Sequence, residues 1–455
     1  MRIELNLNKD SLKAATQSWN TLSNTKNKNK NYCINPSTEE YRKLDKYTPQ
    51  LQINSKVWVL LEKAVKALNE VIDKIYMSSS LQGVVSYKTV CTSIKKELEA
   101  EITRREQDSN NKREFQKILE SIQKAIESEV DYSEFYFVLE GLELEDLTEI
   151  NCGKAEIFIF NEEVRDQLIT LYFGEDKPDF QRLQRIQEFF DENFLNYLCI
   201  KSKAYGDDEM SRRNAYKQAR ELINYFRYIL CLLFHNRIAE QMVRINLLYE
   251  AYNNNERLLI KSKKHDTVSL GYSRGRRPLQ SFSINPSRLQ DMFSNGFMSD
   301  FIEIINASSQ TQVEGCILTA IYWIGEAQNE PDLDVAFLKY WTALECMFSE
   351  KEDTTKSLAK GVTTINAFSS YDFISVGDAK KVYKDIVKLY DKRSDIIHRG
   401  MNYLANQVIN EVDVSEICKY AAWSVLSLFH LRSIDYTTMN QVKSWINVQC
   451  KIWNI

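Results

Sequence analysis

Arg393 and His398 stand five residues apart in the run Arg-Ser-Asp-Ile-Ile-His, close to the end of a strongly apolar helical pattern. A guanidinium keeps its charge and binds phosphate, whereas an imidazole moves protons near neutral pH. These two groups together can break an RNA backbone without a metal. The chain has four histidines, and His398 is the only one with an arginine five to seven residues before it. The surrounding elements must therefore show whether this pair is a site.

The composition is that of an ordinary globular chain, with 44% apolar and 27% charged residues in a length of 455. That length is enough for two to four domains. The formal net charge of −4 gives no overall attraction to nucleic acid, so any such binding needs a local basic patch. Only 13 glycines and 6 prolines are present, which favours helices over a fold rich in strands and turns.

The nine cysteines are spread singly, without a CxxC motif, so neither a disulfide framework nor a zinc site is indicated. The start of the chain lacks the pattern of a secretory signal, and no apolar run reaches the length of a membrane span. Walker, HExxH and GxSxG motifs are absent as well. We expect a reduced, cytoplasmic protein that uses no metal or cofactor and has no membrane partner.

The pattern along the chain predicts a mainly α protein in two regions. Residues 1–308 read as a mostly helical α+β region with small β-sheet elements, with a further boundary near residue 205. Residues 309–455 read as an all-α helical bundle. Helices are expected at 57–76, at 94–129 as an exposed pair, and at 162–173, 180–199 and 212–251. Strands are expected at 1–7, within 132–160, and at 258–262, 267–272 and 279–284.

Four amphipathic segments in the carboxy-terminal region predict an up-down helical bundle. They span 313–325, 335–348, 379–398 and 414–431. Gly400 follows the third segment as a candidate left-handed cap, and Ser415 and Glu416 are expected to start the fourth.

Two polar residues interrupt the apolar faces of this bundle. Glu345 falls in the stripe that Trp341 and Leu344 belong to, and Arg393 falls in the stripe of Ile386, Leu389, Tyr390 and Ile397. Burying either charge alone is costly, so the two are expected to pair. One interpretation is therefore purely structural, with Glu345 and Arg393 as an ion pair and His398 as a helix cap. The other is that the same arginine also serves chemistry.

Two segments of this region resemble a known family. The run Trp323–Ser349 contains a tryptophan-x-alanine-leucine-glutamate cluster, and residues 388–400 end in Tyr-x2-Arg-x4-His-x-Gly. Together they resemble the HEPN superfamily, in particular its ApeA-like branch from bacterial anti-phage systems. The resemblance covers about the last 140 residues. It implies an all-α bundle that dimerises and cleaves RNA without a metal.

The family's arginine and histidine correspond to Arg393 and His398. Its polar position after the arginine falls on Ser394, where the family more often has Asn, Asp or His. Glu345 is a supporting residue through its pairing with the arginine. Asp395 either orients His398 or is simply solvated. A two-fold dimer would bring both copies of the arginine and histidine into one cleft, which supplies two proton carriers.

A second, weaker signal is a basic β-hairpin that holds many cations and almost no acid. Its candidate RNA-binding residues are Lys261, Lys263, Lys264, Arg274, Arg276 and Arg277. A solvated charged hairpin is an equally good interpretation of the same pattern.

Two functions follow from the sequence. The first is a metal-independent endoribonuclease of the HEPN type, which acts in anti-phage defence or abortive infection as a homodimer and responds to a phage-derived trigger. The second is a non-catalytic HEPN module that binds RNA, a nucleotide or a phage protein as a sensor or scaffold.

Overall fold

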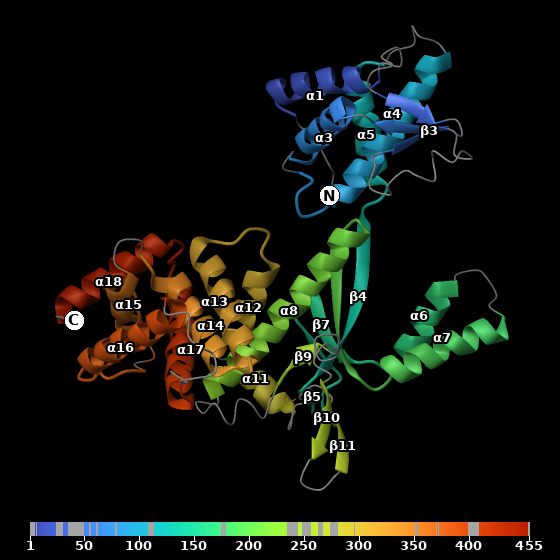
Figure 1. Ribbon diagram of the computed structural model, residues 1–455. Helices are drawn as coiled ribbons and strands as arrows, with labels where there is room; N and C mark the ends of the chain where they lie inside the picture. Colours follow the sequence, from blue (N-terminus) through green and yellow to red (C-terminus); the bar gives the residue numbers. More distant parts are fainter. Residues whose placement is uncertain are drawn as a thin grey trace. The chain divides into compact units, whose positions relative to one another are not determined.

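A computed structural model gives the fold of the chain (Figure 1). It describes residues 5, 7–23, 31–34, 50–53, 56–60, 62–77, 80–107, 113–173, 179–233, 244–247, 256–262, 267–273, 281–294, 296–350, 354–369, 371, 373–398 and 409–453.

The described chain is mainly α, as the sequence predicts, and it divides into two compact units. Unit 1 comprises residues 1–135 and 203–216, and unit 2 comprises residues 136–202 and 217–455. The expected boundary near residue 205 lies close to one of these division points. The bundle that follows residue 309 belongs to the same compact unit as residues 217–308.

Unit 1 is built from helices that share one apolar core and from a small antiparallel sheet. The helices are α1 (Lys9–Leu22), α3 (Glu62–Tyr76), α4 (Tyr87–Gln107) and α5 (Phe115–Glu127), and the sheet has the order β1 (Asn31–Ile34), β3 (Lys56–Leu60), β2 (Gln50–Ile53). Trp19 of α1 packs with its ring centroid 5.8 Å from that of Phe115. The helices bury one face each, because their apolar residues recur at helical spacing.

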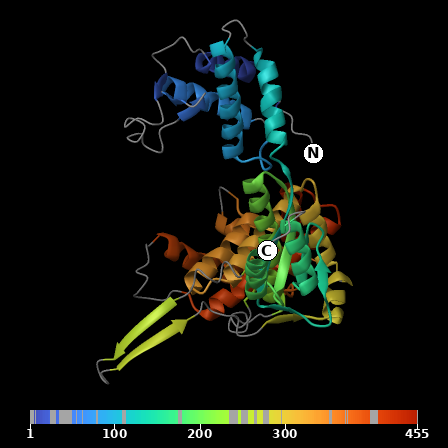
Figure 2. The same cartoon turned by 90° about the vertical axis from the view of Figure 1, so that its right-hand side faces the viewer.

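Unit 2 begins with a five-stranded sheet to which unit 1 also contributes. Its order is β6 (Glu149–Asn151), β7 (Ala155–Ile159), β8 (Leu198–Gly206), β4 (Asp131–Glu140), β9 (Asn246–Leu247). A parallel pair joins β5 (Leu142–Leu144) to β12 (Phe282–Ile284). The strands β10 (Glu256–Ser262) and β11 (Thr267–Ser273) form the predicted antiparallel hairpin, drawn in yellow-green in Figure 2.

The helices of unit 2 fall into two groups. The first is α6 (Glu162–Phe173), α7 (Phe180–Asn193), α8 (Asp208–Leu233, which starts in unit 1), α11 (Pro286–Ser294) and α12 (Phe297–Asn306). The second is the carboxy-terminal bundle: α13 (Gln312–Gln328), α14 (Leu333–Phe348), α15 (Thr354–Phe368), α16 (Ala379–His398), α17 (Glu411–Ser433) and α18 (Met439–Trp453). None of the described helices is long and apolar enough to cross a membrane.

The bundle has two more helices than the four predicted, α15 and α18. The helix α15 contacts α14, α16, α17 and α18 within the bundle. Gly361 of α15 faces the ring of Phe348 so closely that any Cβ there would clash with it. The helix α15 was not among the predicted segments, because buried Thr363, Thr364 and Asn366 interrupt the apolar residues Leu358, Val362 and Ile365.

Several helices and strands begin or end at other residues than the sequence predicts. Residues 57–60 belong to a strand, because the run Val-Trp-Val favours β structure. The predicted helix 180–199 ends at Asn193, and Asn196 takes a left-handed backbone with φ of 65° before β8 begins. Residues 246–247 form a strand inside the predicted helix 212–251. The helix α17 starts at Glu411 behind the capping residue Asn410, ahead of the predicted start.

Other predictions are wrong in part or lie outside the described residues. The pair α4 and α5 is half-buried, with Ile94, Leu98 and Ile118 fully inside, so it is not an exposed pair. The described Leu5 and Leu7 are not in a strand, and Gly400 lies outside the described residues.

Glu314 provides a test of how the bundle is held. It forms a capping box with Thr311 at the start of α13, and its Oε1 accepts a hydrogen bond of 2.9 Å from Arg432 Nε on α17. Burial alone would raise the pKa of Glu314, but the Thr311 N–H and the Arg432 guanidinium outweigh burial and lower it.

A lowered folded-state pKa stabilises the protein above the unfolded pKa, and that stabilisation is lost as pH falls through the folded value. We therefore expect Glu314→Gln to lower the free energy of unfolding by about 1–2 kcal/mol at neutral pH. The difference should shrink as the pH falls below about 4. Urea unfolding at neutral and acidic pH measures this, and a difference that stays constant with pH would contradict it.

Candidate functional site

The candidate site lies on α14 and α16, two neighbouring helices of the bundle. Asp332 caps the start of α14, where its side chain accepts a hydrogen bond from the Val335 N–H. The centroids of the Trp341 and Tyr390 rings lie 5.7 Å apart, with their planes at 62°. This edge-to-face contact joins the two helices one turn before the charged residues.

Glu345 and Arg393 form the ion pair that the sequence predicts. Arg393 Nη2 lies 3.0 Å from Glu345 Oε1, and the two side chains are 20% and 23% exposed. The same oxygen accepts a hydrogen bond of 3.1 Å from Trp341 Nε1. Trp341 is buried and stacks on Phe337 at 6.0 Å, so its indole is held in place. The carboxylate therefore has a fixed position from which it orients the guanidinium.

The guanidinium of Arg393 is only partly used by this pairing. Its carbon lies 5.9 Å from the centre of the Tyr390 ring, and its Nε is buried and donates to no acceptor among the described residues. A guanidinium carries five N–H donors, and the ion pair with Glu345 uses Nη2. The side chain as a whole stays one-fifth exposed.

The other predicted site residues follow Arg393 on α16. Ser394 and Asp395 are half-buried, and His398 is the last residue of the helix. The side chain of His398 lies outside the described residues. Because α16 stays helical up to His398, the backbone positions of Arg393 and His398 point about 140° apart around the helix axis. One chain therefore does not bring the two residues together by helix geometry alone.

Ile397 departs from the expected inward face of α16, since it is 46% exposed. A feature that sequence reasoning missed also acts on this helix. Lys392 Nζ pairs with Asp413 Oδ1 at 2.6 Å, and Asp413 in turn forms a capping box with Asn410 at the start of α17. The only sequence signal was the Asn-x-x-Asp spacing of that capping box. The contact fixes the end of α16 that carries the candidate site.

The basic hairpin is confirmed as a hairpin, but its charged side chains are not described. The backbone of Lys261 lies in β10. The residues Lys263, Lys264, Arg274, Arg276 and Arg277 lie outside the described residues. Their assignment to RNA binding stays a prediction.

The described cysteines are free thiols, and several are inert by burial. Burial raises the pKa of Cys152 and of Cys199 to about 12, so both stay protonated at neutral pH. Cys231 lies 3.5 Å from the Tyr340 hydroxyl inside the core. Among the described residues no group of three or more His, Cys, Asp or Glu side chains could hold a metal ion.

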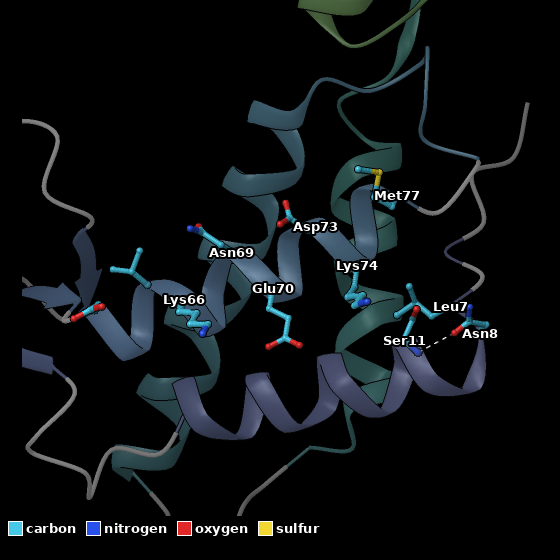
Figure 3. Close-up of a pocket in the computed structure, with 11 residues that line it drawn as sticks. Leu7, Asn8, Ser11, Lys66, Asn69, Glu70, Asp73, Lys74 and Met77 are labelled. Atoms are coloured by element: carbon cyan, nitrogen blue, oxygen red, sulfur yellow. Dashed lines mark hydrogen bonds between the residues drawn. The ribbon is translucent and has the colours of Figure 1, made fainter.

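Unit 1 has a groove of about 1010 Å³ between α1 and α3 (Figure 3). Figure 3 shows Glu70 pointing from α3 toward α1, where its Oε2 accepts a 2.7 Å hydrogen bond from Ser18 Oγ. Lys66 and Lys74 flank Glu70 one turn to either side, so opposite charges alternate. The described lining includes no histidine, cysteine or arginine, and we assign this groove no chemistry.

In comparisons with known proteins, no family model, curated protein or solved structure matches the chain.

The pairing of Glu345 and Arg393 can be measured by a double-mutant cycle on stability. Each single change to alanine leaves a partly buried charge without its partner, so the double variant should lose less than the sum of the singles. We expect a coupling free energy on the order of 1 kcal/mol. The i,i+4 pair Lys217–Glu221 on α8, whose glutamate is 25% exposed but whose lysine is 75% exposed and 3.6 Å away, is the control and should couple by only about 0.3 kcal/mol. Additive losses for the first cycle would mean that the ion pair does not hold α14 to α16.

Proposed function

We propose that the chain is a metal-independent endoribonuclease of the HEPN type. The observation that carries this proposal is the oriented guanidinium of Arg393, which Glu345 and Trp341 fix on the helix that ends in His398. A structural ion pair alone accounts for the glutamate and the arginine. It gives no reason for the histidine five residues further on.

The reaction that suits these residues is attack of the ribose 2′-hydroxyl on the adjacent phosphorus. One group must take the proton of that hydroxyl, and another must protonate the leaving 5′-oxygen. An imidazole serves either step near neutral pH, since it changes charge in that range. The products are a 2′,3′-cyclic phosphate and a 5′-hydroxyl end.

Arg393 has the electrostatic task in this reaction. The negative charge on the phosphate oxygens grows as the fifth bond to phosphorus forms, and a guanidinium held in place stabilises that charge without reorganising. Glu345 is a positioning residue, because it orients the arginine and does not touch the substrate. A lysine at position 393 would lack the fork of donors that serves carboxylate and phosphate together.

Two copies of the chain complete the site in this proposal. The 140° separation on α16 keeps His398 and Arg393 of one chain on different faces, and each chain supplies a single candidate proton carrier. A two-fold dimer places the arginine of one chain near the histidine of the other and provides two imidazoles in one cleft.

The biological setting of the proposal comes from the family resemblance. The enzyme would act in the cytoplasm in anti-phage defence or abortive infection, with RNA as substrate. Residues 1–308 would sense a phage-derived trigger and keep the bundle inactive until it arrives.

His398→Ala tests the proposal. We expect this variant to lose RNA cleavage by a factor of at least about 100, because it removes the proton carrier. Its fold and oligomeric state should stay unchanged. Purified protein is incubated with total cellular RNA in the presence of a chelator, and circular dichroism and light scattering report on the fold and the mass.

His235→Ala is the control, since it removes a histidine from outside residues 309–455, which hold the candidate site and its bundle, and should keep full activity. A folded His398→Ala protein that cuts as fast as the parent would end the ribonuclease proposal. RNA binding without cleavage by the parent protein, with and without phage extract, would favour the non-catalytic binding module.

A further inference from the structure

Three aromatic rings form a nearly parallel column on the surface of the bundle. The Tyr371 and Phe373 centroids are 5.4 Å apart with planes at 19°, and those of Phe373 and Trp423 are 4.9 Å apart with planes at 5°. The first two rings come from the segment between α15 and α16, and the third from α17. Tyr371 is 37% exposed, and the other two are half-buried. The column is therefore most exposed to solvent at its Tyr371 end.

A cation flanks this column at one end, where Lys419 Nζ lies 5.3 Å from the centre of the Trp423 ring. At the other end the His430 ring meets Tyr371 edge-on, with centroids 6.3 Å apart and planes at 77°. The nearly parallel planes and the centroid distances of 4.9 and 5.4 Å describe offset stacking, one of the preferred contacts of aromatic rings. A parallel column with a cation beside it and an exposed terminal ring is the arrangement on which unpaired nucleobases stack.

A row of lysines begins seven residues after Phe373 in the sequence. Lys380, Lys384 and Lys388 are all exposed on α16, and successive members are four residues, or about 6 Å, apart along the helix. Asp385 pairs with Lys388 at 3.2 Å, and Asp391 is the other carboxylate of this stretch, so positive charge remains in excess. His398 follows Lys380 by 18 residues, which is five helical turns, so both backbone positions fall on the same side of α16.

We propose that the column and this lysine row form a track for single-stranded RNA, in which an unpaired base stacks on Tyr371 and phosphates contact Lys380, Lys384 and Lys388. The track leads along α16 toward the residues of the candidate site. This inference rests on the proposed function and names its substrate as RNA with unpaired bases. Double-stranded RNA fits the track poorly, because its bases are already stacked and paired.

Binding by the full-length His398→Ala protein tests the track without cleavage. The probe is a short, fluorescently labelled single-stranded RNA of mixed sequence, and its anisotropy gives the affinity at several salt concentrations. We expect Tyr371→Ala to weaken binding by roughly 5- to 150-fold. The control Tyr172→Ala removes an exposed tyrosine from α6 and should change nothing. A duplex of the same sequence should bind the parent and Tyr371→Ala equally.

The lysines are tested by the salt dependence. Replacing Lys380, Lys384 and Lys388 by glutamine should reduce the slope of log affinity against log salt by about 2. The matched control replaces the exposed lysines 88, 117 and 124 of unit 1 and should keep the parent slope. Photocrosslinking with 5-iodouridine RNA, read by mass spectrometry, should label the peptide that contains Tyr371.

The outcomes separate the track from the proposed function. If the parent protein binds RNA, and both the Tyr371→Ala variant and the triple lysine variant keep its affinity and its salt slope, the track is overturned. The proposed function is not affected by that result. Equal losses for single-stranded and duplex RNA in Tyr371→Ala would overturn base stacking. A parent protein that binds no RNA under any of these conditions would overturn the track and the ribonuclease proposal together.

Discussion

The arrangement of the bundle around the candidate site depends on one carboxylate oxygen. Glu345 Oε1 accepts from the indole of Trp341 and from the guanidinium of Arg393, and so joins a buried residue of α14 to a half-buried residue of α16. A charge in this position is costly unless it is paired, so neither helix can turn or slide without breaking the contact. Both a structural role and a catalytic role require the Arg393 guanidinium to be held in this position. Only the residues beyond it on α16 distinguish a catalytic site from a structural pair.

Much of this arrangement follows from the sequence. Two charged residues inside apolar stripes at helical spacing are enough to predict both the helices and the pairing of Glu345 with Arg393. The hydrogen bond from Trp341 could also have been predicted, since it lies four residues before Glu345 on one helical face. The missed parts have a different origin. The helix α15 buries Thr363, Thr364 and Asn366 beside Leu358, Val362 and Ile365, so its apolar stripe is less clear than those of the four predicted helices.

The remaining errors arise where local preference and tertiary context compete. Residues 57–60 and 198–199 pair as strands, although apolar residues at mixed spacing also fit a helix. The contact of Lys392 with Asp413 joins residues on two different helices, 21 positions apart in the sequence, and no spacing rule links the two. The column of Tyr371, Phe373 and Trp423 likewise depends on the packing of the segment before α16 onto α17, which the aromatic content of the chain could not reveal.

In the proposed reaction the bundle cuts RNA by proton transfer, and a fixed guanidinium stabilises the negative charge. The chemistry of the cut ends is the best test of this reaction. The purified full-length protein is incubated with RNA in excess chelator, and the new 3′ ends are assayed for a terminal 2′,3′-cyclic phosphate. We expect cyclic phosphate ends that form at the same rate with and without chelator. Ends that carry a 3′-hydroxyl, or cleavage that stops when divalent metal is removed, would contradict it.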